Sequence, residues 1–213
     1  MSPQTIGTIW AMVTSSNRPS LKLVGSSTRN VKVLQLKIEL QGVRPKVWRR
    51  VLVPSSIRLP VLHVVLLRLM GWEGGHLHEF EFVEANYGIP NPDWDDGLLV
   101  DESKVSLNKA LGASASFTWL YDYGDSWLHK IKVERVDTMP AELKLQFPMC
   151  LAGSGACPPE DVGGAPGYAD FLLAIADPDH PEHGDMTAWI GRPFDPNAFH
   201  VQEAQDRLYE IKL

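Results

Sequence analysis

The alternation of apolar and polar residues is clearest in residues 117–136, where it predicts an antiparallel β-hairpin. Side chains two residues apart lie on the same face of a strand, so each arm of this hairpin presents one aromatic or aliphatic face. The side chains expected on these faces are Phe117, Trp119 and Tyr121 on the first arm and Trp127, His129, Ile131 and Val133 on the second. The two faces lie on the same side of the sheet only if the turn has the right length.

A two-residue turn at Tyr123 and Gly124 would pair Trp119 with Leu128 and place the two aromatic faces on opposite sides. A three-residue loop, residues 123–125, is the alternative, and its glycine can adopt the left-handed conformation that such loops usually need. It gives the pairs Tyr121 with Trp127, Trp119 with His129, and Phe117 with Ile131. We predict the three-residue loop and a common interior formed by Trp119, Tyr121, Trp127 and His129.

Period-two patterns predict further strands before the hairpin, at residues 34–40, 46–53 and 76–82. In the second of these, Arg49 is expected on the same face as three valines, and Arg50 on the opposite face. In the third, His76 and His78 are expected on the face that also carries two phenylalanines. The resulting order, in which strands do not alternate regularly with helices, favours a largely antiparallel sheet.

Helical spacing predicts one helix after the first two strands, beginning near Pro60 and ending at Gly71. Short helices are expected near the C-terminus, at residues 168–175, 181–190 and 199–213, and a short strand followed by a helical turn at 100–111. Residues 87–97, 137–148 and 150–167 are predicted to be loops or connectors. The fold class is therefore α+β, with residues 31–213 as a single domain and residues 1–30 as a poorly ordered or loosely attached extension.

The composition supports an aromatic-rich core, because 44% of the 213 residues are hydrophobic and the chain has seven Trp and seven Phe. A net charge of −6 argues against a nucleic-acid partner, although a local basic patch at residues 44–50 stays open. No apolar run is long enough to span a bilayer, so we expect a cytoplasmic protein without a membrane partner. Cys150 and Cys157 are then expected to be reduced thiols.

Several polar and aromatic side chains are candidates for a functional site. The candidate cluster is His76, His78, Tyr121, Asp122, Asp125, Trp127, His129, Glu160 and Asp161, with Arg49 and Arg50 as anion-binding candidates. The histidines and Asp122 or Asp125 suit a divalent metal or acid–base chemistry if they converge. The alternative is structural, with aspartates that accept backbone N–H groups at the turn, aromatic side chains in the core, and arginines that stack on rings or pair with acids.

A series of motifs in fixed order resembles the Ri-plasmid ORF-3-like (plasmid pRiA4b ORF-3-like) proteins of bacteria and archaea. The motifs are PKVWRR (45–50), LHVVLLRLMGW (62–72), HLHEF (76–80), YDYGDSWLHKIKVE (121–134), CPPEDVGG (157–164), GYADFL (167–172), DPDHPEH (177–183) and FDP (194–196). The resemblance implies an α+β fold and no established biochemical role. Some family members carry a label that links them to a transposon-borne resolvase, but these residues contain no recombinase pattern and no basic recognition helix.

The chain lacks a phosphate-binding glycine loop, a nucleophile elbow and a dinucleotide fingerprint, so we expect neither a cofactor nor a resident metal. The leading hypothesis is a non-enzymatic binding or interaction module with an unknown protein or small-molecule partner. Its recognition surface would be a groove between the hairpin and residues 150–167. Two alternatives stay open: a metal-dependent hydrolase or nuclease using His76, His78, His129, Asp122 and Asp125, and a transposon-associated DNA-binding protein.

Overall fold

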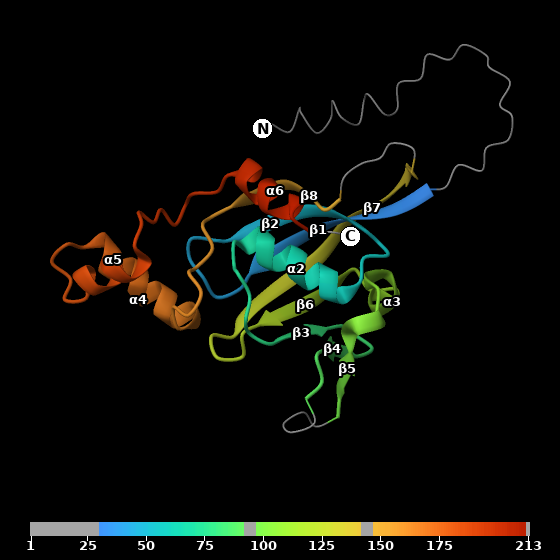
Figure 1. Ribbon diagram of the computed structural model, residues 1–213, viewed down its shortest axis with the longest axis horizontal. Helices are drawn as coiled ribbons and strands as arrows, with labels where there is room; N and C mark the ends of the chain where they lie inside the picture. Colours follow the sequence, from blue (N-terminus) through green and yellow to red (C-terminus); the bar gives the residue numbers. More distant parts are fainter. Residues whose placement is uncertain (1–29, 92–96, 142–146, 212–213) are drawn as a thin grey trace, which may run out of the picture.

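The computed structural model describes residues 30–91, 97–141 and 147–211, and its centre is one eight-stranded sheet (Figure 1). The strands lie in the order β5-β4-β3-β6-β7-β1-β2-β8, and adjacent strands are antiparallel except β4 and β5. Their bounds are β1 Asn30–Leu40, β2 Trp48–Pro54, β3 His78–Glu81, β4 Asn86–Gly88, β5 Leu99–Asp101, β6 Ser116–Tyr121, β7 Trp127–Pro140 and β8 Met149–Ser154. The predicted α+β class with a largely antiparallel sheet is confirmed. The predicted N-terminal extension lies outside the described residues, apart from Asn30, where β1 begins.

The helices are arranged in two groups around this sheet (Figure 1). The long helix α2 (Leu59–Met70) lies across one face, and α6 (Val201–Tyr209) packs against α2 and β8. The helices α4 (Gly164–Ala176) and α5 (His183–Ile190) pack against each other and extend to one side of the sheet. A 3-10 turn η1 (Glu102–Lys104) and the short α3 (Leu107–Leu111) follow β5. The helix α2 ends as predicted, because Gly71 adopts a left-handed conformation with φ 85° and its N–H donates to the Leu67 carbonyl.

The central hairpin has the predicted register, with Tyr121 opposite Trp127 and Trp119 opposite His129. The Ser126 N–H donates to the carbonyl of Asp122 at 2.7 Å and closes the three-residue loop. The sequence predicted that Gly124 would be the left-handed residue of this loop, but its φ is not positive. Instead Asp122 (φ 59°) and Ser126 (φ 55°) are left-handed. Asp tolerates this conformation because its short side chain can bond locally, and the Asp122 carboxylate accepts the Gly124 N–H at 2.9 Å.

The interior predicted for the hairpin is confirmed, since the side chains of Trp119, Tyr121 and His129 are 0% exposed and that of Trp127 is 1% exposed. Trp72, just after α2, completes this aromatic core. Its ring stacks on Tyr121 at a centroid distance of 5.2 Å and contacts His129 edge to face at 5.5 Å. The end of α2 is thereby fixed over the turn end of the hairpin.

Several elements differ in extent from the sequence prediction. The strand β7 continues to Pro140 because it pairs along the whole of β1, so residues 137–140 are not a connector. The start of the glycine- and proline-rich stretch forms β8 on the edge of the sheet beside β2, and its end already belongs to α4. The short β4 lies where a loop was expected. The strand β3 begins only at His78, so His76 precedes the strand.

Candidate functional site

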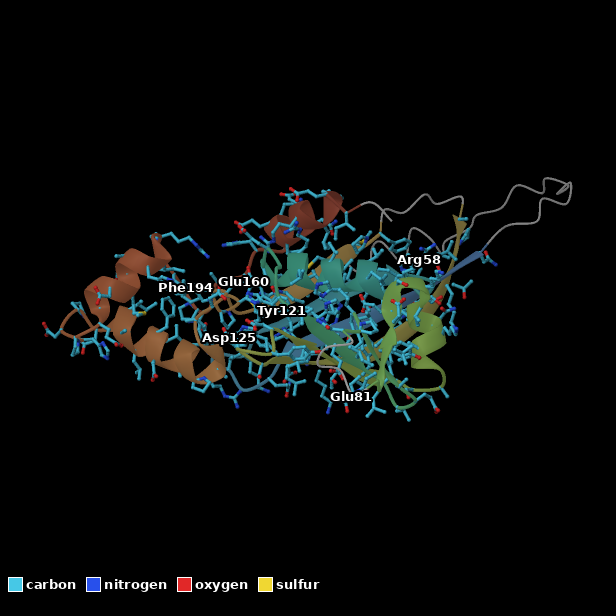
Figure 2. All side chains as sticks on the ribbon, turned by 60° about the horizontal axis from the view of Figure 1, so that its bottom comes forward. Arg58, Glu81, Tyr121, Asp125, Glu160 and Phe194 are labelled. Carbon is cyan, nitrogen blue, oxygen red and sulfur yellow. The ribbon has the colours of Figure 1, made fainter. Side chains whose placement is uncertain are left out.

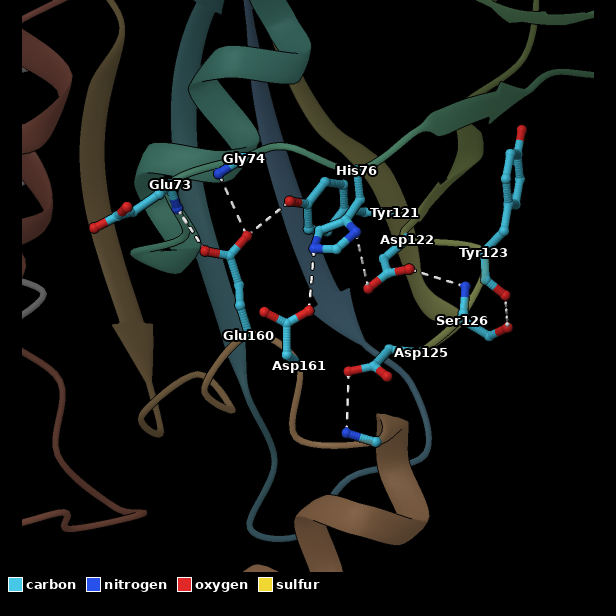
Figure 3. A network of polar contacts seen from close by, with 12 residues as sticks. Glu73, Gly74, His76, Tyr121, Asp122, Tyr123, Asp125, Ser126, Glu160 and Asp161 are labelled. Carbon is cyan, nitrogen blue, oxygen red and sulfur yellow. Dashed lines mark hydrogen bonds and ion pairs between the residues drawn. The ribbon is translucent and has the colours of Figure 1, made fainter. Parts of the chain in front are cut away.

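Glu160, in the loop between β8 and α4, joins three parts of the molecule (Figure 3). Its carboxylate accepts the Tyr121 hydroxyl at 2.7 Å, the Glu73 N–H at 2.8 Å and the Gly74 N–H at 3.3 Å. The Trp72 indole N–H donates to the Pro158 carbonyl of the same loop at 2.9 Å. These bonds hold the loop against the hairpin and the end of α2.

Tyr121 is the hydrogen-bond donor in this arrangement. Burial, and next the hydrogen bond to Glu160, raises the pKa of the Tyr121 phenol above its usual value. The phenol therefore stays protonated at neutral pH and donates to the Glu160 carboxylate.

A second cluster lies beside this anchor and combines His76, Asp122 and Asp161 (Figure 3). The His76 Nδ1 is 3.6 Å from an Asp122 carboxylate oxygen, and its Nε2 is 3.2 Å from one of Asp161. The side chain of Asp122 is 11% exposed, that of His76 35% and that of Asp161 72%. The cluster is thus open to solvent on the Asp161 side and closed on the Asp122 side.

The position of Asp161 relative to the hairpin is set by close packing of the two loops. The Gly163 N–H donates to the Asp125 carboxylate at 3.2 Å. Gly164 has φ +69°, and a Cβ added there would lie 2.5 Å from the Asp125 carbonyl oxygen. Only glycine allows the α4 end of the loop to approach the hairpin turn so closely.

The other two candidate histidines lie elsewhere. His78 Nε2 is 3.1 Å from both carboxylate oxygens of Glu102, and its ring stacks on His63 at 3.5 Å. His129 is fully buried, with Nδ1 3.0 Å from the Trp127 carbonyl oxygen, and burial lowers its pKa to about 3. The five residues suggested for a metal-dependent hydrolase therefore do not converge, and only His76 and Asp122 come together.

Arg49 and Arg50 direct their guanidinium groups to acceptors within the protein. Arg49 is 2% exposed, donates to three backbone carbonyls at 2.9–3.0 Å, and stacks on the Phe199 ring at 4.2 Å. Arg50 donates to both carboxylate oxygens of Glu134, at 2.6 and 3.0 Å. Both environments correspond to the structural alternative for this arginine pair, stacking on a ring and pairing with an acid.

A groove with a volume of about 550 Å³ lies between the end of α2, residues 156–160 and the segment 192–207. The sequence suggested a groove between this loop and the hairpin, but there the Glu160 carboxylate contacts Tyr121 directly. The apolar lining includes Met70, Trp72, Pro158, Pro159, Phe194 and Phe199. The charged lining is Arg49, Arg192, Arg207, Glu73, Glu160, Asp195 and Glu203, with His200 beside them.

Figure 2 shows Tyr121, Asp125, Glu160 and Phe194 toward the α4–α5 end of the molecule, whereas Arg58 and Glu81 lie toward the other end.

Comparison with known proteins places this arrangement in a family. The sequence model of the family described as "Plasmid pRiA4b ORF-3-like protein" matches residues 32–203. The chain belongs to this family. A relative in Sinorhizobium fredii (strain NBRC 101917 / NGR234), described as "Uncharacterized protein y4hQ", is 47% identical over 161 residues, which cover 75% of this chain and 81% of the relative.

A solved structure has a similar fold. The crystal structure of a protein of unknown function, MM3350 from Methanosarcina mazei Go1, is similar with a TM-score of 0.73 and 33% sequence identity. The likeness covers 81% of this chain and 97% of that chain. In the part of the ORF-3-like chain that the structure describes, no helix combines the length and the hydrophobicity needed to cross a bilayer.

Sequence reasoning missed several residues that shape the two sites of this ORF-3-like protein. The two backbone N–H groups at residues 73 and 74 carry no side-chain signal, so their role in holding Glu160 was invisible. The segment 192–207 contributes Arg192, Phe194 and Phe199 to the groove. Its FDP motif at residues 194–196 was a signal that this region matters, but the motif does not reveal which surface it faces.

Proposed function

We propose that this ORF-3-like protein is a binding module that holds a small ligand in the groove between residues 156–160 and 192–207. The groove volume, about 550 Å³, is the observation that carries the proposal. Pockets that enclose small molecules typically measure about 300–1,000 Å³ and combine apolar walls with a few placed polar groups. This groove has both features.

The inner wall of the groove is preformed. Arg49 is fixed by three carbonyls, the Trp72 indole by Pro158, and Glu160 by the Tyr121 hydroxyl and two backbone N–H groups. A ligand would therefore meet side chains that are already ordered. Binding to such a wall avoids much of the entropy cost of fixing flexible groups.

The outer rim supplies charges of both signs. The side chains of Arg192, Glu73 and Glu203 make no ion pair or hydrogen bond with any other described residue. Phe194 and Phe199 contribute apolar surface to the same groove. This combination fits a small molecule that carries an anionic and a cationic group beside an apolar part, as in an amino acid or a short peptide.

A binding screen tests this proposal. Purified protein is mixed with the twenty amino acids, a set of dipeptides and a set of nucleotides, and stabilisation is followed as an increase in Tm. An amino acid or dipeptide should raise the Tm of the wild type and of Arg58→Ala, whose exposed arginine lies far from the groove (Figure 2). The groove variant Arg192→Glu should lose the effect. A screen in which no amino acid or dipeptide binds, or in which Arg192→Glu binds as well as the wild type, would contradict the proposal.

A second readout separates binding from catalysis. The bound compound is incubated with the protein and followed by NMR. A binding module leaves the compound unchanged, whereas appearance of a product at a rate that depends on protein concentration would identify an enzyme.

A further inference from the structure

We propose that His76, Asp122 and Asp161 bind one divalent metal ion, with Zn²⁺ as the expected species. One nitrogen of His76 and one carboxylate oxygen from each aspartate all lie within 4.8 Å of one another. Ligand atoms that share a tetrahedral zinc with bonds of about 2.0–2.1 Å lie about 3.4 Å apart. Binding one ion would therefore require side-chain rotations that draw the three groups together. Imidazole nitrogen with carboxylate oxygen is a ligand set that Zn²⁺ accepts.

The His76 ring lies between the two carboxylates of the cluster. Each of its two nitrogens faces a carboxylate oxygen, Asp122 at 3.6 Å and Asp161 at 3.2 Å. A neutral imidazole has one N–H and one lone pair, so one nitrogen would direct a lone pair at an anion. A metal ion bound to that nitrogen would remove this repulsion.

The surroundings contain an excess of negative charge that favours the metal. Asp122, Asp125, Glu160 and Asp161 lie within the same polar network (Figure 3). In residues 30–91, 97–141 and 147–211, no lysine or arginine forms an ion pair with any of these four. The Asp122 side chain is 11% exposed, and a carboxylate with so little solvent is stabilised by a nearby positive charge. A divalent ion supplies the compensation that the protein's own cations do not.

The ligands come from three segments that other contacts already hold in place. The Asp122 carboxylate uses one oxygen to accept the Gly124 N–H, and its other oxygen faces His76. The His76 ring packs edge to face on Tyr121 at 5.7 Å. The exposed side of Asp161 leaves space for water, so the site has three protein ligands and at least one open position. That is the arrangement of zinc sites that can also bind a substrate or ligand group.

Titration of the protein with Zn²⁺ tests this site. The purified chain is treated with a chelator, dialysed, and titrated with Zn²⁺ in a calorimeter. We expect one ion per chain in the wild type and a loss of affinity of at least about tenfold in Asp161→Asn and in Asp122→Asn. Asparagine keeps the shape of the side chain and tolerates the positive φ of these residues, 61° and 59°, so both variants should fold.

Two controls show that the effect belongs to this cluster. His180→Ala removes a histidine in the turn before α5 and should bind Zn²⁺ like the wild type. Arg192→Glu alters the groove and should also bind Zn²⁺ normally, so failure of the groove proposal leaves this test unaffected. A wild type that does not bind Zn²⁺, or one whose affinity equals that of both aspartate variants, would overturn the metal site.

Discussion

The Tyr121 hydroxyl donates to the Glu160 carboxylate at 2.7 Å and connects the buried hairpin to the loop before α4. Tyr121 also stacks its ring on Trp72, whose indole N–H binds the same loop. Tyr121 therefore belongs to the core of the fold and also holds Glu160, which lines the groove. Changes at this contact should affect both stability and the position of the loop.

Replacing Tyr121 by phenylalanine removes the hydroxyl and keeps the ring in the core. We expect the free energy of unfolding to fall by about 1.5–3 kcal/mol, because the hydroxyl bonds to a charged group. Urea unfolding of the wild type and Tyr121→Phe measures this difference. In a double-mutant cycle with Glu160→Gln, the two changes should show a coupling of about 0.5–3 kcal/mol. A coupling near zero would mean that the two groups do not interact in solution.

The adjacent Arg49 and Arg50 should respond differently to the same conservative change. Arg49→Lys cannot supply the planar group that bonds three carbonyls and stacks on Phe199, so we expect a loss of about 3 kcal/mol. Arg50→Lys keeps an ion pair with Glu134 at the surface and should cost less than about 1 kcal/mol. Chemical denaturation of both variants gives the comparison. Equal losses of stability would contradict the conclusion that the buried Arg49 guanidinium is held by its three carbonyl acceptors and by Phe199.

The hairpin shows what the sequence can predict in this fold. Its register followed from the alternation of Trp119, Tyr121, Trp127 and His129 and from loop length, because a slip of one residue would expose large rings. The same pattern predicted the inward face of Arg49. Both predictions come from the alternation of residues within one strand. Such alternation is reliable where one face of the strand is buried, because a change of register would expose apolar side chains.

The remaining features depend on partners far away in the chain. The strand β8 has no clear alternation and forms because β2 offers an unpaired edge. His76 and His78 fit one alternating pattern in sequence, yet β3 begins after His76 and leaves it beside Asp161 instead. The packing of loops determines that Asp161 lies beside His76. The spacing of residues along the sequence carries no information about that packing.

The close approach of the two loops gives a glycine test with a matched control. In Gly164→Ala, the new methyl group would lie 2.5 Å from the Asp125 carbonyl oxygen on a residue with φ +69°. We expect a loss of at least about 2 kcal/mol in stability from the strained backbone and the clash. Gly184→Ala, on the exposed surface of α5 with no atom within 4 Å of the new methyl group, should instead stabilise the protein by about 0.5–1 kcal/mol. Thermal unfolding of both variants distinguishes these outcomes, and a neutral Gly164→Ala would show that the loops separate easily.

Two histidines with lowered pKa values, His129 and His63, predict that the protein loses stability in mild acid. Burial lowers the pKa of His129 to about 3, and burial together with the neighbouring His78 lowers that of His63 to about 3. Between the ordinary histidine pKa of 6.5 and about 3, the unfolded chain binds protons that the folded protein does not. The stabilisation is therefore complete above about pH 6.5 and decreases as the pH falls, by up to about 1.4 kcal/mol per pH unit for each histidine.

The variant His63→Phe isolates one of these two contributions, because phenylalanine can still stack on the His78 ring at the position where the imidazoles lie 3.5 Å apart. The free energy of unfolding, measured by urea titration between pH 7 and pH 5, should fall less steeply in the variant than in the wild type. The difference in slope should approach about 1.4 kcal/mol per pH unit. Carboxylates titrate in both proteins and cancel in this comparison. Identical slopes would mean that His63 binds a proton as readily in the folded protein as in the unfolded chain, which a ring packed against His78 and the edge of Trp119 does not allow.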